Sequence, residues 1–222
     1  MKIILLQKQT IETLNIMELV MSGGILGDII MMVLGFLSIL SIYYITERLM
    51  ALKNVSKEDP EFTDQLNKLI SEGNTEEALS LCKNKNTPLS RMIKKGVLRL
   101  DSPINEIYAA IENQGKLEVS VLEKNLTSLA TIAGAAPMIG FLGTVIGMII
   151  AFFNMSKAGG SIEVGMLSEG IYTAMITTVA GLVVGIVSYI SYNFLISKID
   201  TIVFKMEKST TDFMDNIHKL SK

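Results

Sequence analysis

The stretch APMIGFLGTVIGMIIAF, residues 136–152, decides the fold of this chain. It carries no charge and is apolar enough to lie in lipid, yet it includes five small or helix-weakening residues: Pro137, Gly140, Gly143, Thr144 and Gly147. Four of them recur in steps of three and four, and Gly143 lies beside that row, so all five share one helical face. Small residues let helix backbones approach closely in a membrane, where no hydrophobic force drives them together. The stretch therefore predicts a membrane helix with one face suited to close contact.

A matching row of small residues occurs later in the chain: Ala174, Thr178, Gly181, Gly185 and Ser188, with Thr173 and Thr177 beside it. Two long helices with such faces predict tight helix packing. One interpretation stops there, because a threonine hydroxyl can bond a carbonyl one turn back in its own helix and so remain satisfied in lipid. The other interpretation is that the faces line a passage in which hydroxyls hold water or pass an ion. Neither row contains a titratable residue, so a proton carrier would have to come from elsewhere.

Charged residues are absent from three long windows, residues 29–46, 125–156 and 170–197. A membrane-spanning helix needs about 20 mostly apolar residues, so the windows predict three transmembrane helices. The composition agrees, because 49% of the residues are hydrophobic and 19% are charged, whereas a soluble domain usually has about 25% charged residues. The predicted fold class is an all-α membrane protein.

The second and third of these helices are expected to be longer than the membrane is thick. The second window would measure roughly 48 Å as a helix, against a hydrocarbon core of ~30 Å. In the C-terminal tail, residues from Ile196 to Leu220 form a stripe with alternating steps of three and four, which predicts an amphipathic helix that covers neighbouring helices. Both helices therefore extend into a predicted cytoplasmic helical bundle.

Lys and Arg residues predict the orientation. Twelve lie between the first and second windows and five lie in the tail, whereas the loop between the second and third windows has only Lys157. By the positive-inside rule, the long segment and the tail are cytoplasmic and the N-terminus is outside. The predicted organisation is an N-terminal periplasmic arm or amphipathic helix over 1–24, transmembrane helix 1 over 25–46, a cytoplasmic helical domain over 47–128, transmembrane helix 2 over 129–153, a periplasmic loop over 154–168, transmembrane helix 3 over 169–196 and a cytoplasmic helical tail over 197–222.

Several classes of function are disfavoured by the composition. The net charge of -2 and the lack of a basic patch interleaved with aromatics argue against a nucleic-acid partner. Cys82 is the single cysteine, and His218 has no second ligand nearby in sequence, so neither predicts a metal site. The three windows contain no Ser/His, Cys/His or paired-carboxylate arrangement. The chain is therefore expected to be no enzyme and to need no cofactor.

Three stretches resemble the MotA/TolQ/ExbB family of ion-channel subunits. LSILSIYYITERLMALK, residues 37–53, is similar to the family's first span, which ends in a Glu-Arg pair, here Glu47 and Arg48. LATIAGAAPMIGFLGTVIGMIIAF, residues 129–152, resembles the second-span signature, and GIYTAMITTVAGLVVGIVSYISYN, residues 170–193, resembles the third span. The short N-terminal arm and the three-span layout look more like ExbB or TolQ than four-span MotA.

The resemblance implies a complex in the bacterial inner membrane. Family members form pentamers around the membrane helices of an ExbD-like or TolR-like partner, each of which contributes a membrane Asp. The proton-motive force then drives the inner helices, and the work reaches a protein of the TonB or TolA type. In this picture the small faces line the pore, and Thr144 and Thr178 match the family's pore threonines.

The third span departs from the family pattern at one position. Many ExbB and TolQ proteins carry a glutamate five residues before the matching threonine, where this chain has Thr173. The nearest acid, Glu169, lies about one turn further out, where it either enters the pore mouth or remains an interfacial charge in contact with water. The departure leaves open whether the ion is H⁺ or Na⁺.

Three functions remain as alternatives. The first is an ExbB-like motor subunit that energises TonB-dependent outer-membrane transport. The second is a TolQ-like stator or a stator for gliding or defence, with Na⁺ as a possible ion. The third is a passive membrane scaffold held together by small-residue packing, in which the threonines carry no ion.

Overall fold

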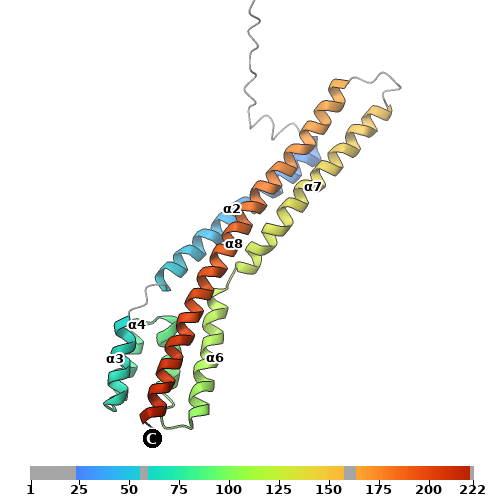
Figure 1. The fold of residues 1–222 in the computed structure, drawn as a ribbon. Coiled ribbons are helices and arrows are strands. Elements are labelled where there is room, and N and C mark those ends of the chain that lie inside the picture. The colour runs from blue at the N-terminus through green and yellow to red at the C-terminus, as the bar shows by residue number, and fades with distance from the viewer. Residues whose placement is uncertain (1–23, 56–59, 158–163, 221–222) are drawn as a thin grey trace, which may run out of the picture. The chain divides into compact units, whose positions relative to one another are not determined.

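The computed structural model describes residues 24–55, 60–157 and 164–220, and every secondary-structure element in this part of the chain is a helix. The helices are α2 (Gly24–Val55), α3 (Pro60–Ser71), α4 (Thr75–Lys85), α5 (Pro88–Val97), α6 (Ile104–Leu122), α7 (Leu126–Lys157) and α8 (Val164–Leu220) (Figure 1). Three helical stretches are long and apolar enough to cross a membrane: Leu26–Lys53, Ile104–Lys157 and Gly170–Lys219. The predicted fold class, an all-α membrane protein, is confirmed. The predicted N-terminal arm lies outside the described residues, apart from Gly24.

The chain divides into two compact units. Among the described residues, unit 1 takes those within 24–40 and 132–187, and unit 2 takes those within 41–131 and 188–220. Helices α3 to α6 belong wholly to unit 2, whereas α2, α7 and α8 contribute to both units. The second and third membrane helices are long, as predicted, because α7 has 32 residues and α8 has 57.

Unit 1 has a small interior and an apolar exterior. Ile30 and Leu34 of α2 are buried together with Ala136 of α7. Many large apolar side chains of the unit are exposed, among them Met32, Phe36, Met138, Phe141, Val179 and Val183. Such a surface would be unfavourable in water, so it suits contact with lipid or with other membrane helices.

Unit 2 has a conventional buried core. Leu66 of α3, Ile93 of α5, Ile111 of α6 and Phe213 of α8 are each almost completely buried in one cluster. The C-terminal stripe of α8 supplies further members of that cluster, Ile199, Met206 and Ile217, with Ile196 and Val203 packed against it. The prediction that this stripe covers neighbouring helices of the same chain is confirmed.

The turn between α4 and α5 is fixed by local hydrogen bonds. Asn86 ends α4 with φ 44, in the left-handed region that asparagine tolerates. Thr87 and Ser90 then form a reciprocal capping box, with N···O distances of 3.2 and 2.8 Å. Arg91 of α5 donates to both carboxylate oxygens of Glu118 on α6, at 2.8 and 2.6 Å, and so joins the two helices.

Helices α6 and α7 are separate, although the apolar sequence runs almost without punctuation between them. The chain turns at Asn125, which has φ 64. Arg48 of α2 donates to the carbonyls of Val121 and Leu122, at 3.0 and 3.4 Å, and its side chain is almost completely buried. Asn125 donates to the Glu47 carboxylate at 3.0 Å. Arg48, about two turns before the end of α2, therefore supplies a charged donor to the last two carbonyls of α6, one of which also accepts from the Lys124 N–H at 3.4 Å.

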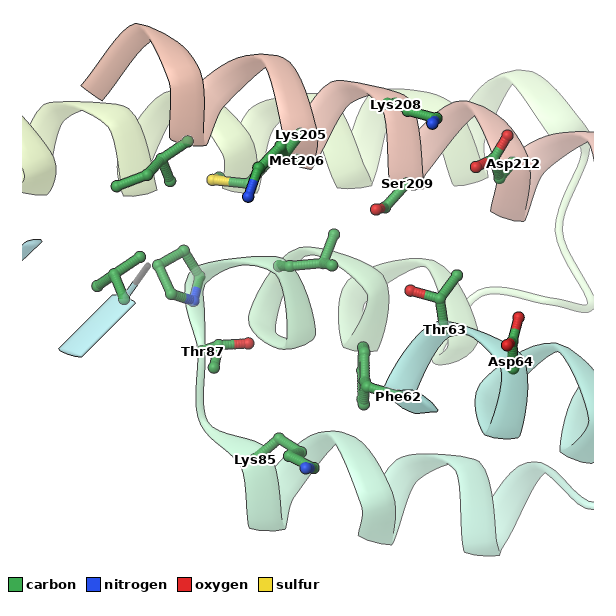
Figure 2. Close-up of a pocket in the computed structure, with 14 residues that line it drawn as sticks. Phe62, Thr63, Asp64, Lys85, Thr87, Lys205, Met206, Lys208, Ser209 and Asp212 are labelled. Carbon is green, nitrogen blue, oxygen red and sulfur yellow. The ribbon is translucent and has the colours of Figure 1, made fainter. Parts of the chain in front are cut away.

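Two further features of unit 2 lie along α8. Ser41 of α2 and Ser188 of α8 are buried, and their hydroxyl oxygens are 2.7 Å apart. A groove of about 500 Å³ lies between α8, α3 and the α4–α5 turn (Figure 2). Figure 2 shows that both signs of charge line this groove, in Asp64, Lys85, Lys205, Lys208 and Asp212.

We predict that Arg48→Ala lowers the free energy of unfolding by roughly 2–3 kcal/mol, because buried carbonyls of α6 lose a charged donor. Thermal unfolding of the purified chain in detergent measures this loss. Arg99→Ala is the matched control, since Arg99 is exposed. Equal midpoints for Arg48→Ala and Arg99→Ala would contradict the assignment. Arg48→Lys should recover part of the loss, because one ammonium cannot both reach the α6 carbonyls and bind the two Glu47 carboxylate oxygens as the guanidinium does.

We also predict that the Cys82 thiol reacts slowly in the folded protein. Cys82 is buried in the unit 2 core, and burial raises the pKa of its thiol from 9.0 to about 11. The reactive thiolate is therefore scarce at neutral pH and increases as the pH rises towards that pKa. Labelling by a disulfide reagent should be slow in detergent and fast in denaturant. The same rate in both conditions at pH 7 would be inconsistent with this burial.

Candidate functional site

The small-residue faces of α7 and α8 meet each other within unit 1. A Cβ atom built on Gly140 would lie 2.6 Å from the carbonyl oxygen of Thr177 and 3.1 Å from the Cα of Gly181. A Cβ atom on Gly181 would lie 2.5 Å from the carbonyl oxygen of Ala136. Real Cβ atoms do not approach backbone this closely, so Gly140 and Gly181 are required for the observed separation of the two helices.

The other predicted small positions extend this contact in both directions. A Cβ atom on Gly147 would lie 2.6 Å from the Cβ of Ala174. On Gly143 it would collide with the Thr177 hydroxyl, and on Gly185 it would collide with the Pro137 ring. The predicted small residues therefore lie at a contact between α7 and α8 of the same chain.

Close approach brings threonine hydroxyls to carbonyls of the opposite helix. Thr144 of α7 donates to the Ala174 carbonyl at 3.0 Å, and Thr178 of α8 donates to the Gly140 carbonyl at 3.2 Å. The hydroxyls of Thr144 and Thr178 also contact each other. Each threonine hydroxyl has one proton and two acceptor lone pairs. Two protons are therefore available for three contacts, two with carbonyls and one between the hydroxyls. At any moment, at least one hydroxyl oxygen has an acceptor position open.

Thr177 differs from this pair. It is almost completely buried between the helices, whereas Thr144 and Thr178 are half-buried. Its hydroxyl lies 2.8 Å from the Ala174 carbonyl and 3.1 Å from the Gly140 carbonyl. Thr177 is therefore placed for packing, although the sequence interpretation grouped it with the ion pathway.

An apolar groove of about 530 Å³ runs along the exposed side of α7 next to Thr144. The described residues that line it are Phe141, Thr144, Val145, Met148, Ile149 and Phe152. Thr144 supplies the one hydroxyl among these six side chains. A helix placed in this groove would meet an apolar wall with a single polar position.

Two predicted site residues have side chains outside the described part of the structure. Glu169 and Thr173 lie in α8, and their side-chain positions are not described.

The sequence interpretation passed over Asp28, which directly precedes the first uncharged window. Its Oδ1 atom is buried and has no hydrogen-bond partner within the described residues. The sequence did carry a signal for Asp28, because it is an acidic residue at the edge of an 18-residue uncharged run. Placing an ionisable group inside a membrane costs free energy, and such groups are often functional.

A comparison with family models gives one match, to the MotA/TolQ/ExbB proton channel family, over residues 84–208. That range includes α5 and α6, the whole α7–α8 contact and the threonine pair. It covers more than half of the chain.

Individual relatives are similar over different lengths. A putative biopolymer transport protein ExbB homolog from Methanothermobacter thermautotrophicus is 29% identical over 196 residues, 87% of this chain and 67% of the relative. Biopolymer transport protein ExbB from Helicobacter pylori is 40% identical over 81 residues, 36% of this chain and 55% of the relative. Tol-Pal system protein TolQ from Haemophilus influenzae is 28% identical over 227 residues, 93% of this chain and 95% of the relative. The alignments thus span about two thirds of the first relative, about half of the second and nearly all of the third.

We predict that Gly140→Ala lowers the free energy of unfolding by about 1–3 kcal/mol, because the added methyl group must separate α7 from α8. Gly134→Ala on the same helix is the matched control. Gly134 is exposed, and a Cβ atom there would meet nothing within 4 Å. The control should be neutral or stabilising by up to about 1 kcal/mol, since alanine favours helix more than glycine does.

Thermal unfolding in detergent compares the two variants directly. The same sign and size of shift for Gly140→Ala and Gly134→Ala would contradict the close contact between α7 and α8.

Proposed function

The chain belongs to the MotA/TolQ/ExbB proton channel family, and from this premise we propose that it is the wall subunit of an ion-driven motor in the bacterial inner membrane. In this proposal several copies, five by analogy with the family, surround the membrane helices of an ExbD-like or TolR-like partner. The partner carries the titratable Asp. The ion gradient across the membrane drives movement of the partner helices, which energises TonB-dependent transport across the outer membrane.

The observation that carries this proposal is the Thr144–Thr178 pair beside the apolar groove of α7. Phe141 and Val145 are exposed on this side, so a partner helix could pack there without displacing water from charged groups. The threonine hydroxyls already bond to backbone carbonyls of their own chain. The wall therefore remains stable in a low-dielectric site even when no ion or partner side chain is next to it.

The hydroxyl pair favours some ligands over others. Its protons are largely committed to the Ala174 and Gly140 carbonyls, so it offers oxygen lone pairs to whatever approaches. Lone pairs accept a hydrogen bond from a protonated carboxylic acid or from a water, and they can contribute to the coordination of Na⁺. They stabilise a bare carboxylate poorly. In the proposed cycle, the partner Asp therefore passes the pair in its neutral or ion-bound form.

The same wall could serve another output. The alignment with TolQ from Haemophilus influenzae covers 93% of this chain and 95% of that protein, which favours a TolQ-like stator as the second candidate. The two candidates share the ring, the partner Asp and the threonine pair. They differ in the protein that receives the work, which is of the TonB type in one and of the TolA type in the other. No catalytic step and no cofactor are assigned to the chain in either case.

We predict that Thr144→Val and Thr178→Val each lower ion flux about fivefold, since valine keeps the shape and removes one acceptor worth about 1 kcal/mol. Flux is measured in vesicles that contain this chain and its partner, with H⁺ and Na⁺ gradients imposed separately. The ion whose gradient supports flux is then identified in the same assay.

Thr131→Val is the matched control for this experiment. Thr131 lies on α7, is exposed and bonds only to the Thr127 carbonyl one turn back among the described contacts. Its replacement should leave flux unchanged. Undiminished flux in the Thr144→Val and Thr178→Val variants would contradict the role of the threonine pair, and no flux in the wild-type assembly under either gradient would favour the passive scaffold.

A further inference from the structure

A second groove of unit 2 lies between α2 and α8, just beyond the uncharged parts of both helices. Its volume is about 640 Å³. The lining residues are Leu49, Leu52, Lys53, Phe194, Ser197, Lys198, Thr201, Ile202 and Lys205. They combine apolar side chains, hydroxyls and lysines.

The charge of this groove has one sign. Lys53 and Lys198 line this groove alone, Lys205 lines both it and the groove of Figure 2, and no Asp or Glu occurs among its described lining residues. The neighbouring groove of Figure 2 differs, because Asp64 and Asp212 accompany its lysines. The α2–α8 groove is therefore the one that attracts an anion.

Two of the three lysines, Lys53 and Lys198, lie at a similar depth along the two helices. Ser41 of α2 and Ser188 of α8 are hydrogen-bonded to each other, which fixes the register of the two helices. Lys53 follows Ser41 by twelve residues, and Lys198 follows Ser188 by ten. At 1.5 Å per residue in a helix, the two lysines lie about 18 and 15 Å beyond the serine pair. The two levels differ by less than one helical turn, so Lys53 and Lys198 lie at a similar level, beyond the uncharged stretches of both helices.

One side of the groove is apolar and exposed. Leu49 and Phe194 remain 40% and 51% exposed, and Ile190, one turn before Phe194, is 63% exposed. The Lys198 ammonium lies 5.3 Å from the centre of the Phe194 ring. An apolar stem with a charged tip is the arrangement that long basic side chains adopt where hydrocarbon meets head groups.

We propose that this groove binds an anionic phospholipid, with its phosphate between Lys53 and Lys198 and an acyl chain along Leu49 and Phe194. An anionic head group satisfies the two ammonium groups, and the acyl chain covers apolar side chains that would otherwise face water. A head group alone would leave the apolar side chains uncovered, and an acyl chain alone would leave the two ammonium groups without an anion. The site requires only that the helices lie in a membrane, so it holds whether or not the chain conducts ions.

Native mass spectrometry of the full chain in a neutral detergent tests the proposal. Phosphatidylglycerol and phosphatidylcholine are titrated separately, and the apparent Kd of the first bound lipid is compared. One lysine beside an anionic lipid strengthens binding about fivefold, so two should give a preference for phosphatidylglycerol of about 25-fold. In the Lys53→Gln/Lys198→Gln variant this preference should fall to about one.

Lys83→Gln/Lys95→Gln is the matched control. Both of these lysines are exposed on the helices of unit 2, neither lines the groove, and the change in net charge is the same. This variant should keep the full preference. Because all four lysines are exposed, both variants should unfold at the wild-type temperature.

Three results would overturn the proposal. The first is equal binding of both lipids by the wild-type chain, as expected if another copy of the chain fills the groove. The second is an unchanged preference in Lys53→Gln/Lys198→Gln. The third is complete displacement of phosphatidylglycerol by an equal concentration of inorganic phosphate, which would show that the groove takes a free anion.

Discussion

The close contact of Gly140 with Gly181 is the constraint on which unit 1 depends. Without a Cβ atom at either position, the backbones of α7 and α8 approach until hydroxyls of one helix reach carbonyls of the other. Lipid supplies no hydrophobic force to hold membrane helices together, so van der Waals contact and such hydrogen bonds must do so. A methyl group at either glycine would remove both contributions at once.

This contact also explains how the proposed wall can remain uncharged. Thr144, Thr177 and Thr178 each bond to a backbone carbonyl, so the described polar groups of the contact are satisfied within the chain. The half-buried pair keeps acceptor lone pairs that can serve a passing ligand. A fixed charge at the same place would hold an ion or a partner carboxylate too strongly for rapid release. In the proposed motor, the titratable group is therefore better carried by the partner.

Residue spacing was sufficient to predict the helices and the small-residue faces, because helical period and hydropathy are local properties. It also predicted that these faces pack tightly, but it left open whether they pack against each other or line a passage, because that depends on how distant segments pack. The break at Asn125 was missed for the same reason: Arg48 and Glu47, more than 70 residues earlier, supply the hydrogen bonds that stabilise it. Thr177 was grouped with Thr178 because adjacent residues look alike in sequence, whereas a 100° step around the helix buries only one of them.

The central claim is that the Thr144–Thr178 pair faces a moving helix of a partner subunit. Cryo-electron microscopy of the chain assembled with its partner measures this directly, as the distance from Thr144 Oγ1 to the nearest atom of another chain's membrane helix. We expect a partner helix within direct contact or one bridging water, about 3–5 Å. Acyl chains around Thr144, with the partner helix against a different surface, would contradict the account.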